Sequence, residues 1–208
     1  VGRNFNPEVG FVRRVGLRKP SFGYRRRFFP NSGWIRSIEP HFSVNQWFTI
    51  ESNDKESDFQ HFHFTGRLQD GGQFGAAFNR SFERLDQSFE VNPGTFIASG
   101  RYRFSEAALD YSTDPSKVLF FQFDFAKGQF YDGDLLNYGV QAGFRPSAKL
   151  SWIGTYAKNK IDLPSGSFDT DLVGLRFNWS FTPKSYLQAF SQYNSVTRQI
   201  GHNIRFAL

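Results

Sequence analysis

Apolar and polar residues alternate along most of this chain. Between residues 38 and 50 the apolar side chains fall at even positions, such as Phe42, Val44 and Phe48, while Glu39 and Ser43 occupy odd ones. A period of two predicts a β-strand with one apolar face. The same alternation returns in segment after segment, and it predicts about eleven long strands, the first at 21–29 and the last at 203–208.

Turn-forming residues separate these segments. The breaks fall at 30–33, 52–57, 69–72, 83–99, 112–117, 127–134, 145–148, 159–167, 182–185 and 195–201. Tight breaks alternate with longer ones. Pro115, Pro146 and Pro183 each stand second in a four-residue turn, at 114–117, 145–148 and 182–185, that lies within a tight break. Short turns at one end of a sheet and long loops at the other are typical of a transmembrane β-barrel.

Composition supports this prediction. The chain has 208 residues, 27 of them Phe, yet its hydrophobic content is only 39% and its mean hydropathy is −0.49. A barrel spreads aromatic residues over a lipid-facing band and keeps its lumen polar. The predicted fold is therefore all-β: an antiparallel up-and-down meander of about 11 long strands forming a partial (open) transmembrane β-barrel. A soluble two-sheet sandwich with one wet face remains the alternative.

Strand parity predicts which way side chains point. We expect six phenylalanines to face lipid: Phe42, Phe64, Phe78, Phe123, Phe144 and Phe177. We expect four polar residues to face the lumen: Arg103, Gln141, Arg176 and Asn178. Trp34, Tyr102 and Tyr131 lie near turns and are candidates for the aromatic girdle at a membrane interface.

The pattern stops in mid-strand at Leu208, and an odd number of strands does not close a standard bacterial barrel. We therefore expect one β-barrel-like domain over residues 1–208, with a lead segment at 1–20 and the meander at 21–208. We also expect it to be a fragment whose missing N- and C-terminal parts belong to the same polypeptide. The strands at 21–29 and 203–208 should then expose free edges.

Charge and cysteine content narrow the choice of partners. The formal charge is +6, from 25 Lys and Arg against 19 Asp and Glu, and the basic residues are mostly dispersed. This distribution predicts a solvated or lumen-facing surface and no nucleic-acid partner. The absence of cysteine excludes disulfides and thiolate metal sites.

Catalytic motifs are absent from the sequence, which has no G-x-S-x-G, P-loop or H-E-x-x-H. We predict no catalytic residue and no cofactor, and leave open whether the protein is an enzyme. Asp132, Asp134, Asp169 and Asp171 are weak candidates for calcium ligands on two successive loops. Ordinary turn chemistry explains the same acids.

Two histidines share one strand face. His61 and His63 are two residues apart, which puts their imidazoles about 7 Å apart. A zinc site needs three or four ligands. His41 has matching parity, but pairing about a turn at 52–57 would place it opposite Leu68, roughly seven residues along from His61. The sequence therefore disfavours a metal site here.

Four separated motifs resemble a known family. They are NFNPEVGFVRR at 4–14, FYDGD at 130–134, IDLPSGSFDTDL at 161–172 and QYN at 192–194. Together they resemble the C-terminal region of bacterial proteins grouped as domain of unknown function 5916. The resemblance implies a β-barrel-like region in Gram-negative envelope proteins, notably of Bacteroidetes type, that often carry an N-terminal carbohydrate-binding module similar to family 9. It implies no activity for any residue of this chain.

These observations lead to two expectations of function. The first is a segment of a bacterial outer-membrane β-barrel, in contact with outer-membrane lipid, that acts in envelope structure or in passage of a polar solute such as a saccharide. The second is a soluble all-β module that binds carbohydrate or accompanies a glycoside hydrolase.

Overall fold

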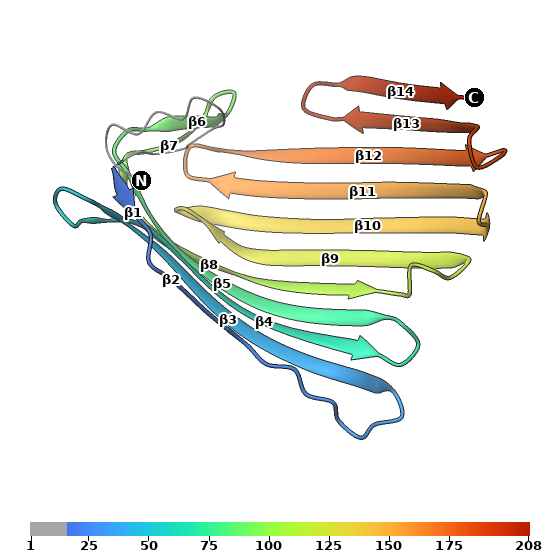
Figure 1. Cartoon of the computed structure of the whole chain (residues 1–208). Coiled ribbons are helices and arrows are strands. Elements are labelled where there is room, and N and C mark those ends of the chain that lie inside the picture. The colour runs from blue at the N-terminus through green and yellow to red at the C-terminus, as the bar shows by residue number, and fades with distance from the viewer. Residues whose placement is uncertain (1–15) are drawn as a thin grey trace.

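The computed structural model describes residues 16–208, so the motif at 4–14 lies outside the described residues. These residues form one long, curved sheet and one small hairpin, with no helix (Figure 1). The strands are β1 (Leu17–Arg18), β2 (Ser21–Arg25), β3 (Ile35–Thr49), β4 (Lys55–Leu68), β5 (Gln73–Leu85), β6 (Phe89–Asn92), β7 (Thr95–Ile97), β8 (Gly100–Ser112), β9 (Leu119–Phe130), β10 (Gly133–Ser147), β11 (Leu150–Leu163), β12 (Gly166–Ser180), β13 (Tyr186–Asn194) and β14 (Gln199–Ala207).

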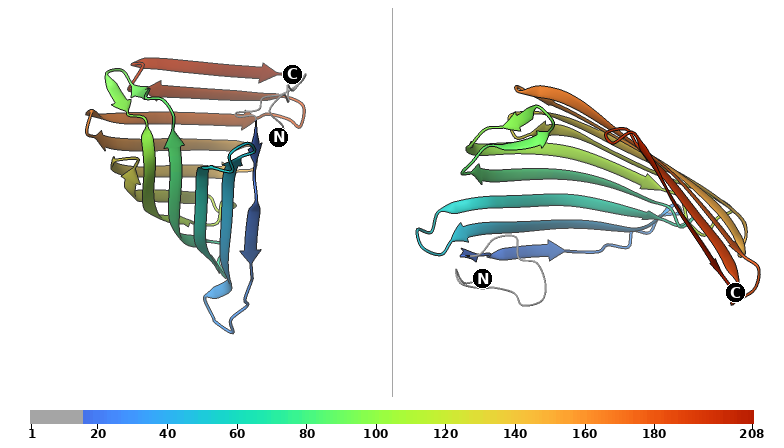
Figure 2. Two further views of the ribbon diagram at one scale, coloured as in Figure 1. Left: turned by 90° about the vertical axis from the view of Figure 1, so that its left-hand side faces the viewer. Right: turned by 90° about the horizontal axis from the view of Figure 1, so that it is seen from above.

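The large sheet is an antiparallel meander, which confirms the predicted strand order. Each strand from β3 onward pairs with the next one, except that β5 pairs with β8 because β6 and β7 form a separate hairpin. β1 and β2 both pair with β3, and β14 pairs with β13 alone. The sheet twists so strongly that its first and last strands run in different directions (Figure 2), and the described residues form no closed barrel.

The eleven predicted strands correspond to β2–β5 and β8–β14. The first is shorter than expected, since β2 ends at Arg25. Beyond it the pairing continues only through a hydrogen bond from the Arg26 N–H to the Pro40 carbonyl and an isolated bridge between Phe28 and Ile38. Pro30 follows directly and cannot donate to a ladder. The alternation of apolar and polar residues therefore located the strands well, because each has one face that differs in polarity from the other.

Connection lengths do not alternate, so that prediction is wrong. β9 and β10 are joined by residues 131–132 alone, and β11 and β12 by 164–165. The segments 127–134 and 159–167 are rich in polar residues and glycine, yet most of their residues continue the ladder. Polarity there reflects exposure of the strand ends and not a break in hydrogen bonding. Of the connections predicted to be long, only 86–99 clearly is.

The sheet is a single layer, and it has almost no hydrophobic core. Among the described residues the only buried hydrophobic side chains are Ile97, Phe120 and Leu163. The phenylalanines within residues 16–208 are therefore not gathered between two stacked sheets, as the sandwich alternative requires. No helix long and apolar enough to span a membrane lies within residues 16–208.

The β6–β7 hairpin folds back onto the distant β11–β12 turn (Figure 1). The Ser165 hydroxyl accepts a hydrogen bond from the Phe96 N–H at 3.0 Å and donates one to the Phe96 carbonyl at 2.5 Å. Ile97 is fully buried and Leu163 nearly so. The hairpin thus joins the middle of the sheet to a turn four strands further along.

Candidate functional site

One face of the sheet carries all six phenylalanines that parity selected. Directly paired residues share a face, so the register can be followed from strand to strand. Phe42 pairs with Phe62, which pairs with Phe78. The remaining ladders continue the same face from β5 to β12 through further cross-strand pairs. These pairs are Phe78–Ala107, Tyr111–Phe123, Leu119–Phe144, Phe144–Trp152 and Trp152–Phe177. We call this the apolar face.

The opposite face, here the polar face, is the more sheltered one. Phe120 points to it and is 5% exposed, whereas its neighbours Leu119 and Phe121 point to the apolar face and are 56% and 50% exposed. Glycines on the polar face leave space that neighbouring side chains fill. A Cβ on Gly143 would overlap the Phe120 ring, and one on Gly139 would overlap the Asp124 carboxylate.

The register places Gln141, Arg176 and Asn178 on the polar face, as parity predicted. Arg176 and Asn178 line a hollow of about 280 Å³ together with residues of β13 and β14. The other lining residues are Gln188, Ala189, Phe190, Asn203 and Arg205. The Arg176 guanidinium lies over the Phe190 ring, 5.3 Å from its centre, so the hollow combines an aromatic surface with amide and guanidinium donors.

Arg103 lies on the apolar face, so its predicted orientation is wrong. It pairs with Phe82, and its guanidinium sits 5.7 Å from the centre of that ring. An inward Arg103 would put Tyr102 and Phe104 on the outward side of β8, but Ala107, Leu109 and Tyr111 are the residues in register with the apolar face. Aromatic content alone could not decide between the two faces of this strand.

Charged residues occupy one end of the apolar face, next to the connections at 50–54 and 131–132. Lys158 Nζ lies 3.1 Å from Asp169 and 3.7 Å from Asp171, and the Tyr156 hydroxyl donates to Asp171 at 2.7 Å. A hollow of about 780 Å³ opens in the same end zone, over β4, β5 and β8. Its lining includes Lys55, Asp58, Gln60, Arg80, Arg101 and Arg103. The apolar face is therefore divided into an apolar band and a charged margin.

The three residues of the predicted aromatic girdle lie in different surroundings. Trp34 is exposed in the connection before β3, next to the apolar band. Tyr102 instead pairs with Glu83 on the polar face, which contradicts an outward position. Its ring contacts Tyr131 at 5.2 Å, and its hydroxyl donates to the Ala98 carbonyl. Tyr131 also contacts Phe89, so this aromatic cluster packs against the β6–β7 hairpin.

The four acidic candidates for calcium do not form a cluster of their own. Asp169 and Asp171 interact with Lys158, and Asp134 pairs across the ladder with Asp162. Asp132 lies in the two-residue turn between β9 and β10. Within residues 16–208 the one group of three or more potential ligands whose atoms lie within 4.8 Å of one another consists of histidines.

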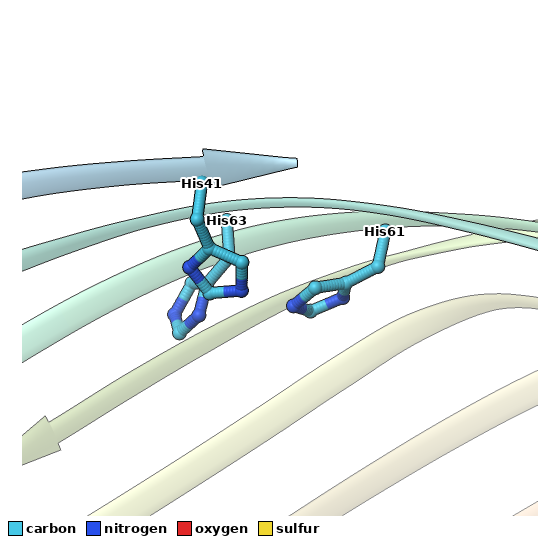
Figure 3. Close-up of side chains that lie close together, drawn as sticks. All are labelled: His41, His61 and His63. Carbon is cyan, nitrogen blue, oxygen red and sulfur yellow. The ribbon is translucent and has the colours of Figure 1, made fainter. Parts of the chain in front are cut away.

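That group is His41, His61 and His63, on the polar face of β3 and β4 (Figure 3). His41 pairs directly with His63, and the ring centre of His41 lies 4.9 Å from the ring centre of His61 and 4.9 Å from that of His63. The predicted pairing with Leu68 is wrong because the turn lies at 50–54 and β4 already begins at Lys55. The parity of the three histidines was the available signal, and the misplaced turn concealed it.

Polar residues of neighbouring strands hold two of these histidines. The Asn79 amide donates to Glu106 at 2.8 Å, and the Asn79 carbonyl oxygen lies 2.6 Å from His61 Nδ1. Asp110 Oδ1 lies 3.6 Å from His63 Nε2. The Nδ1 atom of His41 and the Nε2 atom of His63 are buried without a hydrogen-bond partner.

Comparison with known proteins adds no relative. No protein-family model matches the chain, and no curated protein matches it either. The resemblance to domain of unknown function 5916 therefore stays a prediction.

Proposed function

We propose that this sheet is a membrane-spanning segment of a bacterial outer-membrane β-barrel. In this proposal its apolar face contacts lipid, and its polar face lines a path for a polar solute such as a saccharide. The observation that carries the proposal is a continuous apolar band across one face of a single-layer sheet, with no second layer over it among residues 16–208. Exposed aromatic and aliphatic side chains on this scale are costly in water and favourable in a bilayer.

The height of the apolar band supports this proposal. On β10 the band runs from Leu136 to Phe144, and on β12 from Val173 to the following Phe181. Eight steps along a strand span about 27 Å, or about 20 Å along the membrane normal at the usual tilt. An outer-membrane barrel has an apolar band about 25 Å tall. The charged margin at the far end of the strands would then lie beyond the hydrocarbon.

The composition of the polar face supports the passage of a polar solute. Its hollow between β12 and β14 offers the Arg176 and Arg205 guanidiniums and three side-chain amides beside the Phe190 ring. Hydroxyl-rich solutes such as saccharides are recognised by a few placed polar groups beside an aromatic surface.

The outer edges of β2 and β14 need partners in hydrocarbon, where unpaired backbone groups cost several kcal/mol. No enzymatic step is part of this proposal.

Two adjacent residues on β12 provide a matched test. Phe177 lies on the apolar face and Asn178 on the polar face. Arginine on a lipid-facing position costs about 2–4 kcal/mol at the bilayer centre, whereas a lumen position tolerates it. We expect Phe177→Arg to fold into detergent micelles much less completely than Asn178→Arg, as measured by circular dichroism and by resistance to protease. Phe123→Arg and Gln122→Arg repeat the comparison on β9.

Equal folding yields for the two members of each pair would contradict the proposal. A wild-type chain that is monomeric and folded in buffer without detergent would contradict it as well, because the apolar band would then be stable in water. Analytical ultracentrifugation in buffer and in micelles separates these outcomes.

A further inference from the structure

We propose that His41, His61 and His63 bind a divalent transition-metal ion of the zinc class on the polar face of the sheet. All three side chains project from the same side of β3 and β4, and their rings converge (Figure 3). The cross-strand pair His41–His63 and the spacing of His61 from His63 on one strand create this arrangement. The proposal rests on the fold alone and not on the proposed membrane function.

The spacing of the nitrogen atoms suits one ion. Each histidine offers a nitrogen, and these atoms lie within 4.8 Å of one another. Zinc binds imidazole nitrogen at about 2.0–2.1 Å, so three nitrogens on one tetrahedral ion are about 3.3 Å apart. The rings need to approach by no more than about 1.5 Å, which small side-chain rotations supply.

Hydrogen bonding around His61 fixes the tautomer that a metal needs. The Asn79 amide nitrogen donates to Glu106, which identifies the atom facing His61 as the amide oxygen. That oxygen can only accept, so His61 Nδ1 carries the proton and Nε2 keeps its lone pair. Ligating histidines in metalloproteins are oriented by this kind of outer partner.

Two further groups at the site are incomplete without a ligand. His41 Nδ1 and His63 Nε2 are buried and have no hydrogen-bond partner, an arrangement that folded proteins usually avoid. The Asp110 carboxylate, 3.6 Å from His63 Nε2, adds a negative charge next to the cluster that favours a cation. Neither nitrogen is held in a hydrogen bond, so both are available to a metal ion.

The ligand set selects the class of metal. Three neutral imidazoles suit zinc and its neighbours in the first transition series, whereas calcium and magnesium require oxygen ligands. Three protein ligands leave the fourth position of a tetrahedral ion open to water or to a solute. This position would face the same polar surface along which the proposed function routes a polar solute.

The test uses zinc and cobalt salts on the folded chain without a histidine tag, in buffer or in micelles, whichever keeps it folded. We expect zinc to bind with one-to-one stoichiometry in calorimetry, and cobalt to show the visible absorption of a four-coordinate ion that zinc then displaces. Calcium should give no heat of binding. Failure of the chain to enter micelles would contradict the membrane proposal and leave this measurement possible in buffer.

The fourth histidine of the chain provides the matched control. His202 lies on β14, where its Nδ1 is 2.9 Å from the Ser191 hydroxyl, far from the cluster in the strand order. We expect His41→Gln, His61→Gln or His63→Gln to lower zinc affinity by about 100-fold or more, and His202→Gln to leave it unchanged. Asn79→Ala, which keeps all three ligands, should lower it by about 10–100-fold.

Absence of saturable zinc binding by the wild-type chain would overturn the proposal, and so would an equal loss in His202→Gln. The cobalt spectrum of the wild-type chain does not depend on any variant folding, so a featureless spectrum would also overturn it.

Discussion

Trp152 stacks on Phe144, with ring centres 5.7 Å apart and planes only 15° from parallel. Phe177 lies on the other side of Trp152 at 5.6 Å, so three neighbouring strands each supply one ring of a row across the apolar face. Such pairs contribute about 0.5–1.5 kcal/mol beyond the area they bury. The row also puts a fluorescent residue at the place where the proposed function requires lipid.

Trp152 should therefore report contact with lipid. In a chain whose other three tryptophans are replaced by Phe, we expect lipids brominated on their acyl chains to quench Trp152 emission strongly. A chain that keeps only Trp47, which pairs with Ser57 on the polar face, should be quenched much less. Similar quenching of the two emissions would argue that the two faces meet the same environment.

Gly75 permits the contact between Asp110 and His63. A Cβ at this position would overlap the Asp110 carboxylate and lie 2.7 Å from His63 Nε2. We expect Gly75→Ala to displace Asp110 and lower zinc affinity by about 10–100-fold, as loss of an outer partner does. Gly154→Ala, where a Cβ would meet nothing within 4 Å, is the control and should bind zinc normally. Unchanged affinity in Gly75→Ala would show that Asp110 does not assist binding.

The β6–β7 hairpin depends on a small buried contact. Ile97 is fully buried, and Ser165 provides two hydrogen bonds to Phe96. Replacing a buried Ile by Ala costs about 2–5 kcal/mol of stability. Here we expect the loss to destabilise the hairpin and not the whole sheet. We expect Ile97→Ala and Ser165→Ala to speed hydrogen exchange in residues 89–97 while β10–β12 stay protected. Uniform acceleration across the sheet would show that the hairpin is not a separate unit.

Asp70 links the β4–β5 connection to the β8–β9 connection, at the end of the strands opposite the charged margin. The Gly72 N–H and then the Lys117 ammonium hold the pKa of its carboxyl below the ordinary value of 3.8. A lowered pKa in the folded state stabilises the fold above the ordinary value, and this contribution is lost as the pH falls through the lowered one. Asp70→Asn should therefore flatten the dependence of unfolding free energy on pH in the acid range below about 5.

Chemical unfolding of both proteins across that range provides the measurement for Asp70. The Lys117→Met variant should keep part of the dependence, because the Gly72 N–H remains. Parallel curves for wild type and Asp70→Asn would contradict the assignment.

Much of the fold could be predicted from the sequence, because each strand pairs with a near neighbour and has faces of unlike polarity. The faces of Phe177 and Asn178 followed from parity alone. Parity failed in β8, where Tyr102 and Phe104 turn inward to pack against Tyr131. That contact joins β8 to the turn between β9 and β10, and an aromatic side chain in a single strand gives no sign of it.

The histidine cluster shows a different limit. The three histidines had the right parity, but their meeting depends on the register of β3 with β4. Register follows from where the turn begins, and a polar stretch such as 50–57 offers several starting points. A shift of the pairing by a few residues separates His41 from His63, so the site could be recognised only once the ladder was known.

The hydrogen bonds between Phe96 and Ser165 join residues 69 positions apart in a sheet whose other pairings are between neighbouring strands. Short-range pairings close small loops and form early in folding, whereas a long-range contact must wait for the segments between its ends. The meander can therefore grow hairpin by hairpin, with docking of β6–β7 as the final step. Once made, that contact spans four successive strands, β8 to β11, and fixes how far the sheet can open or flatten between them.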